Sequence, residues 1–174
     1  MLPKFSPDDA DRAWEAWGCN CGPTALAVMM GMTLDEVRPH LKGFDAKRYT
    51  NPTMMLDALK SIGRRWWKVG TEWPAYGLAR IQWEGPWTQP GVPMRVRYRY
   101  THWVAGWYTA ERGYGVYDCN AMANGTGWVR RVDWEREIVP YILKEAVPRA
   151  NGRWHVTHGI EVQRSHQQIE EAAA

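Results

Sequence analysis

The feature that most constrains this chain is a glycine-bounded polar turn that runs directly into an apolar segment. The turn, residues 18–23, reads Gly-Cys-Asn-Cys-Gly-Pro, and residues 25–32 after it are rich in Ala, Leu and Met. These residue types favour helix. A helix with so few polar atoms is expected to lie buried at the centre of the fold. The sequence therefore predicts a central helix that carries Cys21 in its first turn and ends near Gly31.

The position predicted for Cys21 has a chemical consequence. The first turn of a helix offers unpaired N–H groups and the positive end of the macrodipole, and both favour a negative charge. A thiol placed there has a lowered pKa and is partly thiolate at neutral pH. We therefore expect Cys21 to be a nucleophile, and the competing interpretation is a small, inert core residue.

Composition sets the class of protein. The 174 residues suit one domain with a real core, and the net charge of +3 is too small to favour nucleic acid as a partner. Twelve Trp against two Phe indicate either a Trp-lined groove or a Trp-heavy core. The three cysteines are an odd number, which favours a reduced protein without a disulfide framework.

The sequence also bears on location. Residues 1–13 contain no apolar signal segment, and no window of about 18 apolar residues follows. We therefore expect a cytoplasmic protein, or one packaged into a particle, with no membrane partner.

The order of the predicted elements indicates an α+β fold. Residues 1–13 read as a loosely ordered lead-in. Helices are expected after it, including one that begins at the capping box of Thr33 and Glu36 and one over residues 54–62. Strands are expected at residues 64–69, 77–83, 92–100, 102–108, 115–118 and 154–162, with a helix from about residue 133 to 145. We predict a single domain over residues 1–162, with helices in 14–63, an antiparallel sheet in 64–162 and a polar tail at 163–174.

Alternation within residues 92–100 places three arginines on one side of a predicted strand. These are Arg95, Arg97 and Arg99. Such a row binds phosphate or, more commonly, forms a solvated sheet face.

A second pair of residues completes the expected chemistry. A cysteine nucleophile needs a histidine base, and the base needs an acceptor on its other ring nitrogen. His102 starts one predicted strand, and Asp118 ends the next. A hairpin turn at residues 111–113 would bring these two strand ends side by side, so we predict that His102 and Asp118 are neighbours.

These motifs together resemble the papain-like cysteine peptidases, and in particular the bacteriocin-leader (double-glycine) peptidase branch. The resemblance rests on Asn20-Cys21-Gly22-Pro23-Thr24-Ala25-Leu26, His102-Trp103-Val104 and Val116-Tyr117-Asp118, and it covers roughly residues 17–140. It implies a papain-like α+β fold in which a helical lobe with a buried nucleophile helix packs on an antiparallel sheet. It also implies Cys21 as nucleophile, His102 as base and Asp118 as the orienting acid. Residues 49–55 and 78–87 are similar to proteins encoded in tailed-phage genomes.

One position departs from the family pattern. The family places a Gln six residues before the cysteine to complete the oxyanion hole, and here that residue is Glu15. Asn20, Trp17 or backbone N–H groups would have to take its place. We expect Trp103, Trp128 and Asn120 to line the substrate groove.

Other arrangements remain open. Cys19, Cys21 and Cys119 with His155 or His158 would make a zinc site, although the spacing is not that of a zinc ribbon. His158 is a rival base, because its surroundings imitate those of His102. Asn120 is a rival orienting residue. A Cys19–Cys119 disulfide, or a pair of inert buried thiols, is the other expectation for the two remaining cysteines.

The sequence thus predicts a thiol-dependent hydrolase that cleaves a peptide or isopeptide-type bond through an acyl-enzyme, without metal or cofactor. The expected partner is a peptide or protein substrate. The alternative is an inactive papain-like scaffold that binds phage particle proteins or a host protein.

Overall fold

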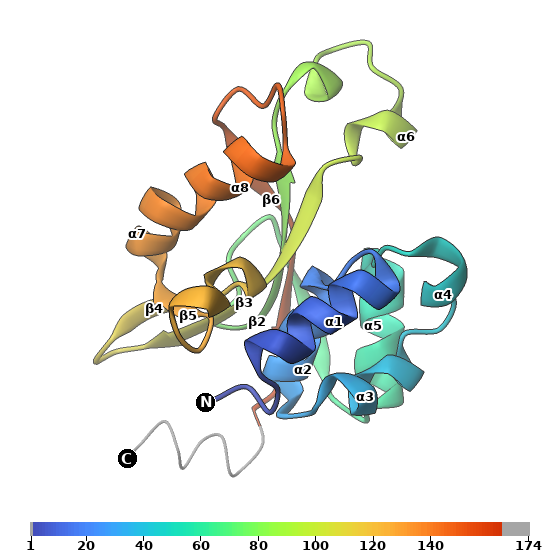
Figure 1. The fold of residues 1–174 in the computed structure, drawn as a ribbon, viewed down its shortest axis with the longest axis vertical. Helices are drawn as coiled ribbons and strands as arrows, with labels where there is room; N and C mark the ends of the chain where they lie inside the picture. Colours follow the sequence, from blue (N-terminus) through green and yellow to red (C-terminus); the bar gives the residue numbers. More distant parts are fainter. Residues whose placement is uncertain (1, 165–174) are drawn as a thin grey trace.

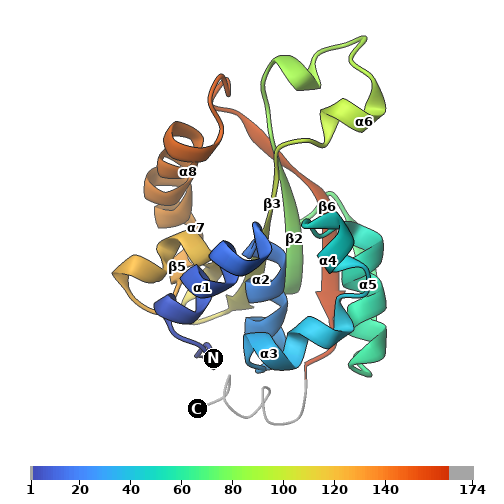
Figure 2. The same cartoon turned by 45° about the vertical axis from the view of Figure 1, so that its right-hand side comes forward.

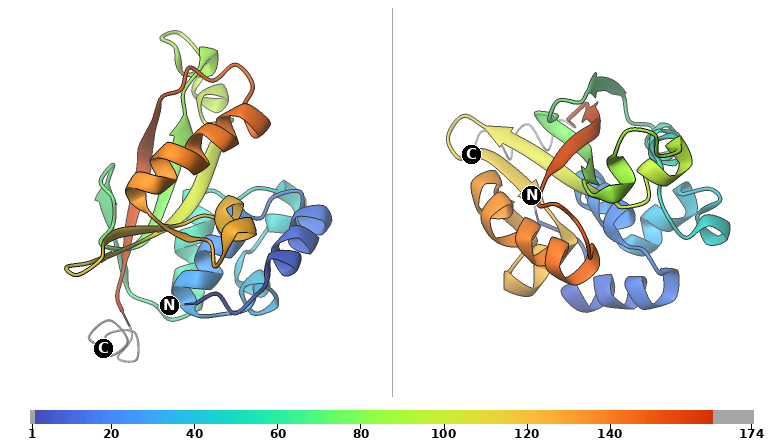
Figure 3. Two further views of the ribbon diagram at one scale, coloured as in Figure 1. Left: turned by 60° about the vertical axis from the view of Figure 1, so that its left-hand side comes forward. Right: turned by 90° about the horizontal axis from the view of Figure 1, so that it is seen from above.

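The computed structural model describes residues 2–164 and has an α+β architecture. Its centre is a six-stranded antiparallel sheet with the strand order β1-β6-β2-β3-β4-β5. The N-terminal helices cover one face of this sheet, and the C-terminal helices cover the other (Figures 1 and 2). Figure 3 shows the same two groups of helices from two further sides.

The strands in chain order are β1 (Trp66–Gly70), β2 (Tyr76–Trp83), β3 (Thr101–Thr109), β4 (Gly113–Tyr117), β5 (Trp128–Arg130) and β6 (Trp154–Val162). The helices are α1 (Pro7–Trp17), α2 (Cys21–Met30), α3 (Leu34–Val37), α4 (Phe44–Lys47), α5 (Pro52–Ser61), α6 (Met94–Arg97), α7 (Arg131–Asp133) and α8 (Val139–Ala146). Short 3₁₀ turns span Arg38–His40, Pro86–Thr88 and Cys119–Asn124, and a π-helical turn over Trp134–Ile138 joins α7 to α8.

Helix α2 is the centre of the N-terminal layer, as the sequence predicts. Every residue from Gly22 to Met30 is buried, and the helix ends at Gly31, whose φ of 62° lies in the left-handed region that favours glycine. The helix packs on β3 and β2, and the Tyr76 hydroxyl of β2 donates a hydrogen bond of 3.1 Å to the Met29 carbonyl. The sheet therefore fixes the position of the helix that carries Cys21.

Alternation along β2 and β3 divides the core between the two faces of the sheet. Leu78 and Trp103 point into the cluster formed with α1, α2 and α5. Ile81 and Val104 point into the cluster formed with α8 and Trp134. All eight residues of β2 are buried, as expected for a central strand covered on both sides.

Residues 1–13 are not the loose lead-in that we expected, because α1 begins at Pro7. Ser6 caps this helix, its hydroxyl accepts the Asp9 N–H, and the Asp9 carboxylate accepts the Ser6 N–H in return. A short helix, α4, follows between α3 and α5.

The strand predicted at residues 92–100 is also wrong. This segment contains α6 and belongs to an excursion between β2 and β3 that projects from the sheet (Figure 1). Pro93, which has no N–H to give to a strand ladder, stands at the N-cap of α6. Trp83 N–H donates to the Tyr100 carbonyl at 3.0 Å and closes the base of the excursion, so the three arginines do not form a row on a sheet face.

The other predicted strands and the helix after residue 131 lie close to their predicted ranges, whereas β5 lies in a stretch for which no strand was predicted. The predicted tail lies mostly outside the described residues. Within residues 2–164, no helix combines the length and the apolar character that crossing a membrane requires.

Candidate active site

Cys21 is the first residue of α2, and its side chain is half-buried. The preceding residue, Asn20, occupies the N-cap position but gives the helix no side-chain cap. Its amide instead donates a hydrogen bond of 2.9 Å to the Ala10 carbonyl in α1. The start of α2 is therefore tied to α1, and the α2 N–H groups near Cys21 are left without a side-chain cap.

The thiol of Cys21 lies beside the thiol of Cys19. The sulfurs of Cys19 and Cys21 lie 3.9 Å apart. The hydrogen bond with the Cys21 thiol, together with the nearby charge of His102 and the N–H groups of Cys21 and Thr50, lowers the pKa of Cys19 to about 7 against the opposing effect of burial. The hydrogen bond with Cys19 and burial raise the pKa of Cys21 well above its ordinary value.

This thiol pair corrects one expectation from the sequence. We predicted a lowered pKa for Cys21, whereas in this state the lowered pKa belongs to Cys19. The two thiols are coupled through this contact, in which either sulfur can be the donor, and burial further raises the pKa of Cys21. The first proton lost near neutral pH belongs to the pair, and the resulting charge lies beside the N-terminus of α2.

His102 and Asp118 are neighbours, as the hairpin argument predicts. The register of β3 and β4 pairs Ala105 with Tyr117, and Asp118 follows directly after β4. His102 Nε2 and Asp118 Oδ2 lie 2.9 Å apart in the interior, with His102 7% exposed and Asp118 0% exposed. The Trp83 ring stacks on the imidazole at a centroid distance of 6.0 Å.

Three further donors hold the Asp118 carboxylate. The Trp134 indole N–H donates to Oδ2 at 2.8 Å, and the backbone N–H and the side-chain amide of Asn120 each donate to Oδ1 at 2.9 Å. Burial alone would raise the pKa of Asp118, but His102 and these donors outweigh it, so the pKa is lowered. Asp118 is therefore an ionised carboxylate in the core.

The same contact defines the tautomer and the basicity of His102. An ionised carboxylate only accepts, so Nε2 carries the proton and Nδ1 is left as the basic nitrogen of the neutral ring. Burial would lower the pKa of His102, but the Asp118 carboxylate and its hydrogen bond raise it above the ordinary value. His102 is thus a stronger base than a free imidazole.

The Cys119 thiol lies close to the His102–Asp118 pair. Cys119 Sγ, a ring nitrogen of His102 and a carboxylate oxygen of Asp118 lie within 4.8 Å of one another. The Cys119 thiol donates to Asn20 Oδ1 at 3.6 Å, which links it to the start of α2. Burial and the Asp118 charge raise the pKa of Cys119 well above its ordinary value, so this thiol stays protonated.

Cys21 contacts β3 at Trp103, the residue that follows His102. The backbone N–H of Trp103 points to the Cys21 sulfur. Among residues 2–164, no hydrogen bond joins the Cys21 sulfur to the His102 ring. Catalytic hydrogen bonds are commonly long or misaligned without substrate. The thiol–imidazole contact of a triad is not made in this conformation.

The residues predicted for the oxyanion hole and the groove differ in their burial and in their contacts. Trp103 is 2% exposed and donates its indole N–H to the Thr50 carbonyl at 3.3 Å, so it is a core residue and not a groove wall. Trp128 is half-buried beside Tyr117 and Trp107. Asn120 is exposed and serves Asp118, as described above.

Trp17 contacts an aromatic ring and a guanidinium group. Its ring packs edge-on against Phe44 at a centroid distance of 6.0 Å, and the Arg38 guanidinium lies over it at 5.5 Å. Asn20 directs its amide to Ala10 and its Oδ1 to Cys119. Glu15, which replaces the Gln of the family pattern, is an exposed residue of α1.

The zinc arrangement expected from the sequence is not assembled. His155 Nδ1 lies 2.9 Å from Glu84 Oε1. His158 lies opposite Arg80 in the pairing of β6 with β2, and burial and that arginine lower its pKa. A group of potential metal ligands in the described residues is instead His102, Asp118 and Cys119. No disulfide joins the cysteines, and all three are free thiols.

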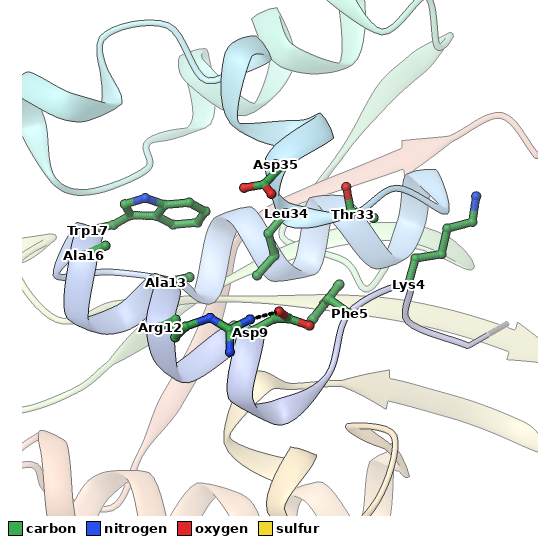
Figure 4. A pocket seen from close by; sticks show the side chains of 10 residues that line it. All are labelled: Lys4, Phe5, Asp9, Arg12, Ala13, Ala16, Trp17, Thr33, Leu34 and Asp35. Atoms are coloured by element: carbon green, nitrogen blue, oxygen red, sulfur yellow. Dashed lines mark hydrogen bonds and ion pairs between the residues drawn. The ribbon is translucent and has the colours of Figure 1, made fainter.

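A surface pocket of about 370 Å³ lies between α1 and the start of α3 (Figure 4). Its lining includes Lys4, Arg12, Trp17 and Asp35, and an ion pair joins Arg12 to Asp9 on its edge. The lining contains no thiol and no histidine. We therefore place the candidate chemistry at the start of α2 and not in this pocket.

Comparisons of the chain with protein-family models, with curated proteins and with solved structures returned no match. Conclusions about activity consequently depend on the residues of the site.

Proposed function

We propose that this protein is a thiol-dependent hydrolase that cleaves a peptide or isopeptide-type bond, with Cys21, His102 and Asp118 as its catalytic residues. The observation that supports this best is the buried His102–Asp118 pair, at 2.9 Å, beside the thiol-bearing start of a buried helix. Structural cores rarely enclose an ionised carboxylate, and an oriented basic imidazole next to thiols is what nucleophilic catalysis requires.

The proposed reaction uses the basic Nδ1 of His102. This nitrogen takes the proton of the Cys21 thiol, and the thiolate attacks the substrate carbonyl carbon to form a tetrahedral adduct. The adduct collapses to a thioester as the leaving amine takes the proton from His102. Water, deprotonated by His102, then attacks the thioester, and the thiol and the free acid are released. Asp118 holds the ring and stabilises the imidazolium formed in each half-reaction.

The oxyanion of the adduct needs N–H donors. The backbone N–H of Cys21, at the start of α2, is the first candidate, and it points to the Cys19 sulfur in this state. The exposed Glu15 is not a donor when ionised. The second donor is proposed to be the Asn20 amide, which would have to leave the Ala10 carbonyl.

The fold is consistent with this proposal. A buried helix headed by the cysteine precedes, in the chain, the antiparallel hairpin with histidine and aspartate. This is the order of the papain-like peptidases, and we propose that fold for the chain.

Alkylation with a low concentration of iodoacetamide at pH 6 tests the proposal, with the modified residue located by mass spectrometry. Tryptic peptides separate Cys119 from the other two cysteines, and fragment ions separate Cys19 from Cys21. We expect one-to-one labelling of Cys21 that is strongly slowed in His102→Ala. In Cys19→Ser, labelling of Cys21 should persist. Preferential labelling of Cys19, unchanged in Cys21→Ser, would make Cys19 the reactive thiol and contradict our assignment.

A second candidate is a non-catalytic papain-like scaffold that binds a phage particle protein or a host protein. Two observations favour it, namely the lack of a thiol–imidazole hydrogen bond and the glutamate at position 15. It predicts slow, equal labelling of all three cysteines, and the same measurement therefore separates the two candidates.

A further inference from the structure

The core contains an arginine that has no acidic partner among the residues that the structure describes. Arg80 lies in the middle of β2 and is 7% exposed. Its Nη2 donates to the Thr101 hydroxyl at 3.1 Å, while its Nε is buried without any hydrogen-bond partner. No carboxylate of residues 2–164 forms an ion pair with it. A guanidinium has five N–H donors, so most of its binding capacity is not used by the protein.

The surroundings of Arg80 add positive charge. His158 lies opposite it in β6, and both Arg80 and Lys68 lower the pKa of that histidine after the effect of burial. The Tyr98 ring, from the excursion between β2 and β3, covers the guanidinium at 5.4 Å. The groups that act on the charge of Arg80 are burial, Tyr98 and the Cys21 thiol, and none of them is a carboxyl group.

This arrangement is unfavourable for the free protein. A buried charge needs a partner of opposite sign and hydrogen bonds to its donors, and without them it destabilises the fold. The other arginines with ion pairs among residues 2–164 are exposed or half-buried, and Arg130, for example, makes a bidentate contact with Asp133 at 2.6 and 3.1 Å. An unpaired cation in the core is therefore expected to meet its anion in a ligand.

Arg80 also lies on the face of the sheet that carries the thiols. Leu78, two residues earlier, packs in the same cluster as α2, and alternation places Arg80 on that face. Its partner in β3 is Trp103, the residue whose N–H points to the Cys21 sulfur. The cation and the proposed nucleophile thus share one neighbour.

We propose that Arg80 binds a carboxylate of the substrate, so that the proposed hydrolase acts on an acyl substrate with an acidic group near the scissile bond. The inference rests on the proposed function, and it adds the chemical class of the substrate. A planar carboxylate suits the fork of a guanidinium better than a point anion does. The acidic group would be a Glu or Asp side chain or a chain-terminal carboxylate.

Two alkylating reagents that differ in one carboxylate test this proposal. Iodoacetate carries the anion, and iodoacetamide is its neutral counterpart. The rate of Cys21 alkylation by each reagent is measured by mass spectrometry and divided by the rate for free cysteine at the same pH. We expect the ratio of iodoacetate to iodoacetamide in the protein to exceed that of free cysteine by about tenfold, as a charge-assisted hydrogen bond would give.

Substitution shows whether Arg80 causes this preference. In Arg80→Gln the ratio of the iodoacetate rate to the iodoacetamide rate should fall to that of free cysteine. Arg80→Lys, which keeps the charge and loses the fork, should retain part of the preference. Arg95→Gln removes the same charge from an exposed position and should change neither rate. Circular dichroism of each variant checks that it is folded.

The failures of the two proposals are distinguishable. A Cys21 that reacts with iodoacetamide no faster than free cysteine contradicts the proposed hydrolase. A Cys21 that reacts rapidly but shows the same reagent ratio in wild type and Arg80→Gln overturns the carboxylate site alone.

Competition then identifies the source of the carboxylate. N-acetylglutamic acid α-amide offers a side-chain carboxylate, and N-acetylglutamine offers a terminal one. Each is added at millimolar concentration during labelling with iodoacetamide. Protection of Cys21 by either compound, lost in Arg80→Gln, supports the proposal and names the source. Protection by neither overturns it.

Discussion

Trp134 donates its indole N–H to Asp118 Oδ2 over 2.8 Å within the core. The same oxygen contacts His102 Nε2 at 2.9 Å, so the indole and the imidazole compete for one carboxylate oxygen and fix its position from two directions. Trp134 is 0% exposed and belongs to the π-helical turn between α7 and α8. The C-terminal helical layer therefore positions the acid of the proposed triad, although Cys19 and Cys21 pack against the core of the N-terminal layer.

Removing this donor should destabilise the protein. In Trp134→Phe the buried carboxylate loses a charge-assisted hydrogen bond and the core loses volume, and we expect a decrease of about 2–4 kcal/mol in the free energy of unfolding. Urea denaturation measures it. Trp67→Phe is the control, because Trp67 is 51% exposed and its substitution should change stability by less than about 0.5 kcal/mol. Equal effects of the two substitutions would contradict the role of Trp134.

Asp118→Asn should reverse the pH dependence that His102 gives to stability. In the wild type Asp118 raises the pKa of His102 above 6.5, so this pair contributes stability below that pH and loses it as the pH rises through the folded-state pKa. Without the carboxylate, burial dominates and the pKa should fall below 6.5, so stability is lost as the pH falls instead. NMR titration of the His102 ring protons, with urea denaturation at pH 5 and pH 8, measures both quantities. A His102 pKa that is unchanged in the variant contradicts this account.

The sequence was sufficient for the parts of the fold with strong local signals. The apolar run after Cys21 predicted the buried helix, and the strand periodicity around His102 and Asp118 predicted their contact across a hairpin. A separation of sixteen residues with one tight turn determines such a contact geometrically. The signal for α1 was also present, because Ser6 and Asp9 form a capping box with Pro7 at the first helical position.

Other features depend on tertiary packing that no local pattern encodes. Trp134 lies sixteen residues after Asp118 in the chain, and its indole can donate to Asp118 only when the C-terminal helical layer docks on the sheet. The thiol pair of Cys19 and Cys21 requires a side-chain arrangement that sequence spacing does not specify. The alternation of Arg95, Arg97 and Arg99 imitated a strand, but Pro93 and the excursion around it formed α6. The burial of Arg80 was likewise not visible from a sequence in which arginines are usually exposed.

Cys21→Ala should change the acidity of the remaining thiol. The Cys21 thiol is the main cause of the pKa of about 7 at Cys19, so its removal should return that pKa toward the ordinary value of 9.0. The pH dependence of Cys19 alkylation in the variant, measured between pH 5 and pH 10, gives this pKa. Cys119→Ala is the matched control and should leave the inflection near 7, because Cys119 is not among the main causes of the Cys19 shift. An inflection near 7 in Cys21→Ala would assign the low pKa to His102 rather than to the thiol pair.

Gly77→Ala should disrupt the pairing of β2 with β6. Gly77 lies in β2, and a Cβ there would collide with the backbone carbonyl of Ile160 in β6, which cannot move aside as a flexible side chain would. We expect a loss of at least about 2 kcal/mol in the free energy of unfolding, measured by urea denaturation. Gly115→Ala in β4 is the matched control, because its Cβ would meet the nearest atom at an ordinary contact distance of 3.5 Å. Since β2 carries Arg80 and pairs with the strand of His102, Gly77→Ala should also slow the alkylation of Cys21, whereas Gly115→Ala should not. Stability in Gly77→Ala equal to that of Gly115→Ala would mean that β2 and β6 are not in the register described.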